Sequence, residues 1–230
     1  MFGKAAGSPK EQMLMNWPER VWIYSPIRVV FLRLHARRWK RLVGPIAGGH
    51  ALEIGCGLGK GAQILIREMG FSQVTAFDLE ETLIARAKRG LPGDLAHGIS
   101  FFVGDSQDLP FPIALFDSVV NYGIIHHVLD WRRCISEIAR VLKPGGIFYF
   151  EEIYPALYAN FLLGPLLRHP TEDRFHGPEF LAELAANGLK LIEGVRTTSR
   201  FGIVGAARKA IFPQDRLPTV LRRANISSST

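Results

Sequence analysis

The stretch "LEIGCGLGKGA" (Leu52–Ala62) guides the interpretation of the whole chain. It joins a short apolar run to a helical pattern through Gly55, Gly57 and Gly59. Glycines at such a junction permit positive φ angles and let a ligand lie against bare backbone near a helix N-terminus. The stretch therefore predicts a strand, a ligand-binding turn and a helix, in that order.

The spacing of these glycines differs from the dinucleotide fingerprint G-x-G-x-x-G. That fingerprint would need a glycine at position 60, where this chain has Lys60. Glu53 lies two residues before the first glycine, and a carboxylate there suits a cationic ligand better than a phosphate. A plain strand-to-helix turn is the alternative reading.

From His50 onward, short apolar runs alternate with longer helical patterns. The runs are "ALEI", "VTAFD", "ISFFVGD", "FDSVVNY" and "GGIFYFEE", and helices are expected at 60–69, 81–90 and 124–142. Pro144 in "KPGG" separates the last of these helices from the fifth strand. Apolar strands separated by helices indicate an α/β fold with a doubly wound, mainly parallel sheet.

Two further patterns lie outside this alternation. "GPEFLAELAANG" predicts a helix, and the apolar runs 189–195 and 201–206 predict a closing pair of strands. Before the sheet, residues 26–43 predict a basic amphipathic helix. Its apolar residues at helical spacing are Ile27, Val30, Phe31 and Leu34, and the basic residues around them are Arg33, Arg37, Arg38, Lys40 and Arg41.

The net charge of +7 is unevenly distributed along the 230 residues. Residues 1–44 hold nine Lys and Arg against two Asp and Glu, residues 45–194 hold twelve against eighteen, and residues 195–230 hold seven against one. Basic ends around an acidic body indicate affinity for an anionic surface, whether phospholipid, nucleic acid or an acidic partner. Improved solubility alone is the alternative.

The sequence also indicates the cellular compartment. Its first residues lack the apolar core of a secretory signal, and we expect a cytoplasmic protein, either soluble or peripheral at the inner membrane face. The cysteines, Cys56 and Cys134, form neither a disulfide framework nor a zinc pattern.

Two more acidic residues follow predicted strands. Asp78 ends the second strand, 19 residues after Gly59, where an acid can accept hydrogen bonds from both hydroxyls of a ribose. Asp105 follows the third strand, with Ser106 next to it. Each acid alone could be a cap or turn residue. Together with Glu53, they indicate a ligand site at the carboxyl edge of the sheet.

Five ordered motifs extend this pattern over about residues 45–152: "LEIGCGLGKG", "VTAFDLE", "VGDSQDLPF", "FDSVVNYGIIHHV" and "RVLKPGGIFYFEE". In these motifs the chain resembles the class I S-adenosylmethionine-dependent methyltransferases. "DLPFP" and "IIHHV" resemble the type 11 branch, which includes quinone-biosynthesis and other small-molecule or lipid enzymes. The resemblance implies a Rossmann-like, seven-stranded sheet with helices on both faces, and S-adenosyl-L-methionine as cofactor.

The resemblance also implies roles for individual residues. Glu53 and the glycine loop would hold the methionine part, Asp78 the ribose and Leu79 the adenine. Asp105 and Ser106 would contact the adenine edge, and Asn121 would lie beside the sulfonium. The full set of expected cofactor-binding residues is Glu53, Gly55, Cys56, Gly57, Gly59, Asp78, Leu79, Gly104, Asp105, Ser106, Asn121, Tyr122 and His126.

The chemistry of methyl transfer needs few catalytic groups, because the sulfonium is already activated and positioning supplies most of the rate. A base is needed only when the acceptor must lose a proton. His126 and Tyr122 are the expected catalytic residues, with structural roles as the alternative. The wider set of candidate bases is His126, His127, His169, Tyr122, Glu151 and Glu152.

The adjacent His126 and His127 do not predict a metal site. Neighbours on a helix point about 100° apart and do not converge on one ion. We expect His126 to lie nearer the cofactor and His127 to be structural.

The acceptor is predicted from the segments flanking the motifs. Residues 1–44 are read as a basic amphipathic extension, 45–212 as the methyltransferase domain with an apolar insertion at 153–175 over the acceptor site, and 213–230 as a disordered basic tail. Apolar residues interleaved with basic ones suit a helix at an anionic membrane. The hypothesis is methylation of a small lipophilic acceptor, such as a quinone precursor or a polar lipid, with residues 17–43 at the membrane surface.

Three alternatives stay open. Both flanking segments could simply cover the sheet. The basic ends could bind RNA for nucleotide methylation, although no RNA-binding motif accompanies them. The chain could also be a cofactor-binding scaffold without transferase activity.

Overall fold

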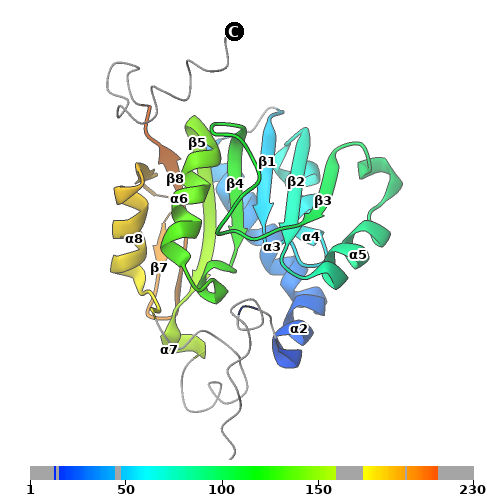
Figure 1. Ribbon diagram of the computed structural model, residues 1–230, viewed down its shortest axis with the longest axis horizontal. Helices are drawn as coiled ribbons and strands as arrows, with labels where there is room; N and C mark the ends of the chain where they lie inside the picture. Colours follow the sequence, from blue (N-terminus) through cyan, green and yellow to red (C-terminus); the bar gives the residue numbers. More distant parts are fainter. Residues whose placement is uncertain (1–12, 14–15, 45–47, 159–172, 195, 212–230) are drawn as a thin grey trace, which may run out of the picture.

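The computed structural model describes residue 13 and residues 16–44, 48–158, 173–194 and 196–211 (Figure 1). A central mixed sheet lies between two layers of helices. Residues 159–172, which belong to the predicted insertion at 153–175 and include the candidate base His169, lie outside the described residues. The predicted tail 213–230 lies outside them too.

The sheet contains parallel and antiparallel strands. In the described residues its order is β3-β2-β1-β4-β5-β8-β6, and the short β7 pairs with β8. Strands β1 to β5 are parallel, and β8 is antiparallel to its neighbours. The strands are β1 (His50–Ile54), β2 (Gln73–Asp78), β3 (Ile99–Val103), β4 (Phe116–Tyr122), β5 (Leu142–Ile153), β6 (Leu189–Leu191), β7 (Thr197–Thr198) and β8 (Gly202–Lys209). This confirms the Rossmann-like, mainly parallel sheet, with seven strands along its main path and β7 in addition.

The strand order changes direction between β1 and β4. The chain first builds β2 and β3 on one side of β1, then crosses to β4 and β5 on the other. Open α/β sheets bind ligands in the crevice beyond the carboxyl ends of the strands at such a switch point. Ile54 of β1 pairs there with Phe77 of β2 and Asn121 of β4.

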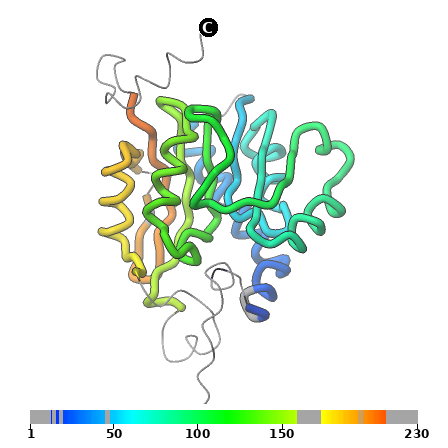
Figure 2. Tube along the Cα trace, in the orientation of Figure 1, coloured from blue at the N-terminus to red at the C-terminus, as the bar shows by residue number. Residues whose placement is uncertain are grey.

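The helices cover both faces of the sheet. They are α2 (Trp17–Tyr24), α3 (Pro26–Val43), α4 (Lys60–Ile64), η1 (Leu65–Met69), α5 (Glu81–Arg89), η2 (Gly93–Leu95), η3 (Ile125–His127), α6 (Trp131–Val141), α7 (Pro155–Tyr158) and α8 (Gly177–Ala186). In Figure 2 the blue N-terminal helices lie on the opposite side of the sheet from the green and yellow helices α6 and α8.

Each face of the sheet has its own apolar core. Trp131 of α6 and Phe180 of α8 pack against Phe150 of β5 on one face. On the other face, Trp39 of α3 packs against Tyr149, also on β5, with ring centroids 5.4 Å apart. Successive strand residues point to opposite faces, so β5 contributes to both cores.

Helix α3 has the bounds that the sequence predicts, because local signals mark its start. Ser25 caps the helix by accepting a hydrogen bond from the Ile27 N–H, and Pro26 occupies the first turn. Leu32, Ala36 and Trp39 form the face buried against the sheet. The N-terminal segment therefore shares the core of the domain.

The predicted helix over 124–142 is wrong at its start. The chain first makes the 3-10 turn η3, and α6 begins at Trp131. Gly123 has a φ of 75°, and the backbone N–H groups of Ile125 and His126 donate to the buried Glu152 rather than to helical carbonyl groups. Asp130 then caps α6 with its side chain.

Among the other predicted elements, some are confirmed and one has different bounds. The helix near 177–186 and the pairing of β6 with β8 are confirmed. The "KPGG" segment lies within β5 rather than outside it, where the pairing with β4 shifts register between Phe116 and Ser118. Helix α2 precedes the helix predicted over 26–43 and is separated from it by Ser25.

None of the helices within the described ranges has both the length and the apolar character required to span a bilayer.

Candidate active site

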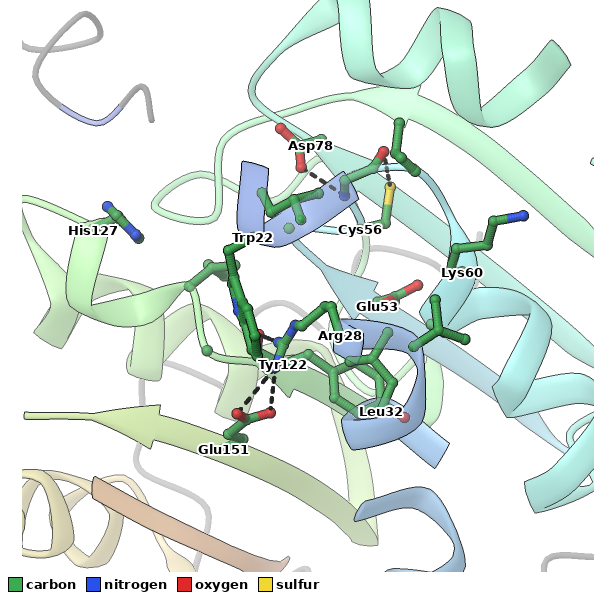
Figure 3. A pocket seen from close by; sticks show the side chains of 18 of the residues that line it. Trp22, Arg28, Leu32, Glu53, Cys56, Lys60, Asp78, Tyr122, His127 and Glu151 are labelled. Atoms are coloured by element: carbon green, nitrogen blue, oxygen red, sulfur yellow. Dashed lines mark hydrogen bonds and ion pairs between the residues drawn. The ribbon is translucent and has the colours of Figure 1, made fainter. Parts of the chain in front are cut away.

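A cavity of about 240 Å³ lies at the carboxyl ends of β1 and β4 (Figure 3). Its floor is the glycine loop between β1 and α4. Helices α2 and α3 form a wall that contributes Trp22, Ile23, Arg28, Val29 and Leu32. The N-terminal segment is thus part of the site.

Glu53 lies inside this cavity wall and is 2% exposed. The Ala62 backbone N–H donates to its carboxyl group, but its Oε2 has no hydrogen-bond partner among the described residues. Burial raises the pKa of Glu53 to about 8, and the nearby Asp78 contributes in the same direction. A buried acid with an unused oxygen is suited to a cationic ligand group.

The glycine loop is held open by Asp78. The Gly57 N–H donates to Asp78 Oδ2 at 2.9 Å, and the Glu80 N–H donates to Oδ1 at 3.0 Å. Gly55 has a φ of 67°, and a Cβ there would lie 2.4 Å from the Ile124 side chain. Burial raises the pKa of Asp78.

Gly59 allows α4 to pack closely against β3. It lines neither of the two cavities near the loop, and a Cβ on it would lie 2.5 Å from the Phe101 ring. Its φ of 70° starts α4 and brings the helix close to β3. A direct cofactor contact at Gly59 stays a prediction.

A second cavity of about 70 Å³ adjoins the first, and both are lined by Gly55, Asp78, Ile124 and His127. Its remaining wall brings together most of the residues expected around the adenine. These are Leu79, Gly104, Asp105 and Ser106. Asp78 therefore stands at the junction of the two cavities, between the glycine loop and the expected adenine side.

Asn121 has a different setting from the expected one beside the sulfonium. It is fully buried and lines neither cavity. Its Nδ2 donates to Glu152 Oε1 and to the Glu151 carbonyl, and its Oδ1 accepts from the Ile124 N–H. The side chain supports the floor of the site, and direct contact with the cofactor stays a prediction.

The two adjacent histidines both line the larger cavity. His126 Nδ1 lies 2.7 Å from Glu152 Oε2, and both side chains are almost fully buried. The His127 ring lies 4.4 Å from the His126 ring, centroid to centroid, and His127 also lines the second cavity. The 3-10 turn, rather than a helix, brings both rings to the same site.

Arg28 is a site residue that the sequence analysis missed. Its guanidinium donates to both oxygens of Glu151, at 3.1 and 3.2 Å, and to the Tyr122 carbonyl. In Figure 3 it lies between Trp22 and Glu151. Although burial alone would raise it, His35 and Arg28 hold the pKa of Glu151 at about 2.

Tyr122 is buried in the cavity wall, and its hydroxyl has no hydrogen-bond partner among the described residues. Burial and the neighbouring Glu53 raise the pKa of Tyr122 well above its ordinary value. Tyr122 is thus poorly suited to act as a base. Cys56 also lines the cavity, and burial raises the pKa of its thiol.

Among the residues that the structure describes, no three His, Cys, Asp or Glu side chains are grouped so as to hold a metal ion.

The residues present fit the cofactor that the resemblance implies. A glycine-lined cavity contains a buried acid with an unused oxygen, suited to an amino group. A second acid lies at the junction to a smaller polar and apolar cavity, suited to a ribose leading to a flat base. The arrangement therefore accommodates a long ligand that is cationic at one end and aromatic at the other.

Comparisons with known proteins agree with this geometry. Residues 52–150 match a family described as "Methyltransferase domain". A fatty-acid O-methyltransferase of Mycolicibacterium smegmatis is 38% identical over 110 residues, which cover 48% of this chain and 39% of that protein. A phthiotriol/phenolphthiotriol dimycocerosates methyltransferase of Mycobacterium tuberculosis is 36% identical over 112 residues, covering 48% and 40%. This chain thus spans about two fifths of the length of these relatives.

Solved structures share the fold. An S-adenosylmethionine-dependent methyltransferase from Mesorhizobium loti aligns with a TM-score of 0.60 at 21% identity, covering 75% of this chain and 97% of that one. The (4+2)-cyclase SpnF aligns with a TM-score of 0.63 at 22% identity, covering 79% and 81%. The motifs, the fold and the family match agree over residues 52–150, which are similar to the methyltransferase domain of the type 11 family.

Proposed function

We propose that the protein transfers a methyl group from S-adenosylmethionine to a small lipophilic acceptor. The observation that carries the proposal is the pair of joined cavities, with the unpartnered Glu53 oxygen in one and Asp78 at their junction. The apolar wall from α2 and α3 supports an acceptor that is itself apolar.

Each part of the cofactor has a proposed place. Glu53 and the glycine loop bind the amino-acid end, Asp78 the ribose, and the smaller cavity with Leu79 and Asp105 the adenine. When bound, the cofactor supplies an activated methyl group. The chain orients the acceptor, excludes water and, where needed, removes a proton.

His126 is the proposed base, since it lines the cavity and contacts a buried carboxylate. Tyr122 is kept as a wall residue, because its raised pKa opposes a base role.

The relatives support a lipophilic acceptor by their names. One is named for fatty acids and the other for dimycocerosates. RNA methylation is not favoured, because none of these names refers to a nucleic acid. A cyclase with the same fold shows that the fold alone does not fix the reaction, so catalytic transfer requires its own test.

Helix α3 supports docking on an anionic phospholipid surface. A single outward stripe at spacings of three and four residues runs through Ile27, Val30, Leu34, Arg37 and Arg41. Its first three members are apolar and 53 to 60% exposed, and they belong to the half of α3 that lines the cavity. Its last two are basic and also exposed. The apolar half would enter the interface near the cavity while the basic half contacts lipid phosphates.

The cofactor part is tested by calorimetric titration with S-adenosylmethionine. Wild type is expected to bind, and Glu53→Gln is expected to bind about 10- to 100-fold more weakly, as expected for a lost charge-assisted contact. No binding by wild type would contradict the proposal.

The membrane part is tested by flotation with phosphatidylglycerol vesicles. Replacing Arg37 and Arg41 by glutamine should weaken partitioning about 30-fold, at about 1 kcal/mol per basic residue. Ile27→Ser with Leu34→Ser should also reduce flotation, while Ile113→Ser, which removes an exposed apolar side chain elsewhere, should not. Equal flotation of all variants would remove the membrane part and leave methyl transfer untouched.

A further inference from the structure

Glu152, near the end of β5, is a buried acid with no assigned role in cofactor binding. Three nitrogen groups donate hydrogen bonds to its carboxyl group: Asn121 Nδ2, the Ile125 N–H at 2.8 Å and the His126 N–H at 3.3 Å. His126 Nδ1, at 2.7 Å, is the fourth contact. Several donors on two oxygens are the arrangement that a carboxylate anion requires.

This arrangement favours one tautomer of the His126 ring. An acceptor-only carboxylate at Nδ1 places the ring hydrogen on that nitrogen, so that Nε2 of the neutral ring is the proton acceptor. Glu152 also accepts from the backbone of the same residue, which holds main chain and ring together.

The neighbouring acid cannot take this role. Glu151 points to the other face of β5, where it is paired with Arg28 and His35. His35 and Arg28 hold the pKa of Glu151 at about 2 despite its burial, so Glu151 is a poor proton acceptor. Because successive side chains of β5 point to opposite faces, Glu151 contacts the α3 wall and Glu152 contacts His126.

The charges of the cavity also limit the acceptor. Arg28 is 12% exposed in its side chain and is already paired with Glu151 and the Tyr122 carbonyl. Lys60, which also lines the cavity, lies far from His127 in Figure 3. Arg28 and Lys60 are the arginine and lysine among the described lining residues, so a carboxylate acceptor near the histidines would lie close to the Glu152 contact and away from Lys60.

We propose that Glu152 is the positioning residue that prepares His126 as the base, and that the acceptor is therefore a hydroxyl-bearing lipid, an alcohol or a phenol, rather than a fatty acid. This rests on the proposed function. The acceptor's O–H proton passes to His126 Nε2 as its oxygen bonds to the methyl carbon, and the C–S bond breaks with its electron pair left on sulfur. Glu152 stabilises the resulting imidazolium. A carboxylic acid is already ionised at neutral pH and needs no such base.

The first test reads the tautomer directly and does not depend on turnover. Nitrogen NMR of ¹⁵N-histidine-labelled protein, with His126→Gln to assign the signal, should show hydrogen on Nδ1 in wild type. Glu152→Gln should redistribute it, and Glu152→Asp should keep it. A wild-type Nδ1 without hydrogen, or an identical signal in Glu152→Gln, would overturn the positioning role.

The second test compares acceptors of matched apolar size: 4-octylphenol, 1-dodecanol and dodecanoic acid. Glu152→Gln should lower kcat for the methylated hydroxyl probe about 100-fold or more with little change in KM, and Glu152→Asp should recover part of it. Wild-type methylation of dodecanoic acid alone, at a rate that Glu152→Gln retains, would overturn the hydroxyl acceptor while leaving methyl transfer established. Cofactor binding with no methylation of any probe would count against the hydroxyl acceptor too, while failed cofactor binding would instead reject the proposed function.

Discussion

Gly61 provides a sharp test of the site, because local and tertiary effects oppose each other there. It lies in α4, where alanine is intrinsically favoured over glycine by about 1 kcal/mol. However, a Cβ at this position would lie 1.9 Å from Glu53 Oε1 and 3.1 Å from Tyr122 Cδ2. Glycine at position 61 thus makes room for the Glu53 carboxyl group.

The expected size of the effect follows from these contacts. In Gly61→Ala, Glu53 must move and lose the Ala62 N–H, which costs about 1 to 3 kcal/mol. Overpacking against Tyr122 costs a similar amount. After the helix gain, unfolding should become easier by about 3 kcal/mol, which lowers Tm by about 6 to 12 °C. Cofactor affinity should fall about 10- to 100-fold.

The assay is thermal unfolding together with calorimetric titration of S-adenosylmethionine. Gly93→Ala is the matched control, because no atom lies within 4 Å of its added Cβ, and it should be neutral or stabilising within about 1 kcal/mol. A Gly61→Ala variant with wild-type affinity and a raised Tm would refute the assignment of Glu53 to the cofactor cavity.

Three further predictions concern stability and are measured by urea unfolding. The folded-state pKa of Glu53, about 8, exceeds its unfolded value. Glu53 should therefore lower the unfolding free energy by up to about 1.4 kcal/mol per pH unit as pH rises from about 4.5 to 8. Glu53→Gln should flatten this slope, and an unchanged slope would contradict the burial of Glu53. The pKa of Glu151, about 2, lies below its unfolded value, so its stabilisation should be lost as pH falls from about 4.5 towards 2. In Arg28→Gln the folded-state pKa of Glu151 should rise towards the unfolded value, so this loss should be smaller and end at higher pH, and superimposable acid limbs would argue against the ion pair. Asp130→Ala should cost about 1 kcal/mol through the lost cap of α6, whereas no loss would mean that the cap is unimportant.

The parts of the fold that sequence predicts best are those encoded by neighbouring residues. The apolar runs correspond to the five parallel strands, and the helix predicted over 26–43 has the bounds of α3, where Ser25 provides a local cap. The acids that end β1, β2 and β3 were expected at one edge, and two of them, Glu53 and Asp78, line the same cavity.

The errors arise where distant residues override local patterns. The helix expected from 124 is replaced by a turn because Glu152, on another strand, takes the N–H groups of Ile125 and His126. Arg28 was missed because its partner Glu151 is 123 residues away, and only the fold brings them together. The same turn places His127 in the lining of the cavity next to His126, and its structural role stays a prediction.

The faces of α3 show a further limit. Periodicity identified the apolar set containing Ile27, Val30 and Leu34, but the structure buries Leu32, Ala36 and Trp39 instead. Both faces carry apolar residues, so the pattern alone cannot say which one packs on the sheet.

The central claim, methyl transfer to a lipophilic acceptor at the Glu53 cavity, is tested most directly with isotopic label. The protein is incubated with S-adenosylmethionine labelled in its methyl group and with lipid and quinone extracts, and the products are examined by mass spectrometry. The account predicts a labelled lipid heavier by one CH₂ group with wild type and far less of it with Glu53→Gln. Cofactor binding without any labelled lipid, or equal labelling by Glu53→Gln, would contradict it.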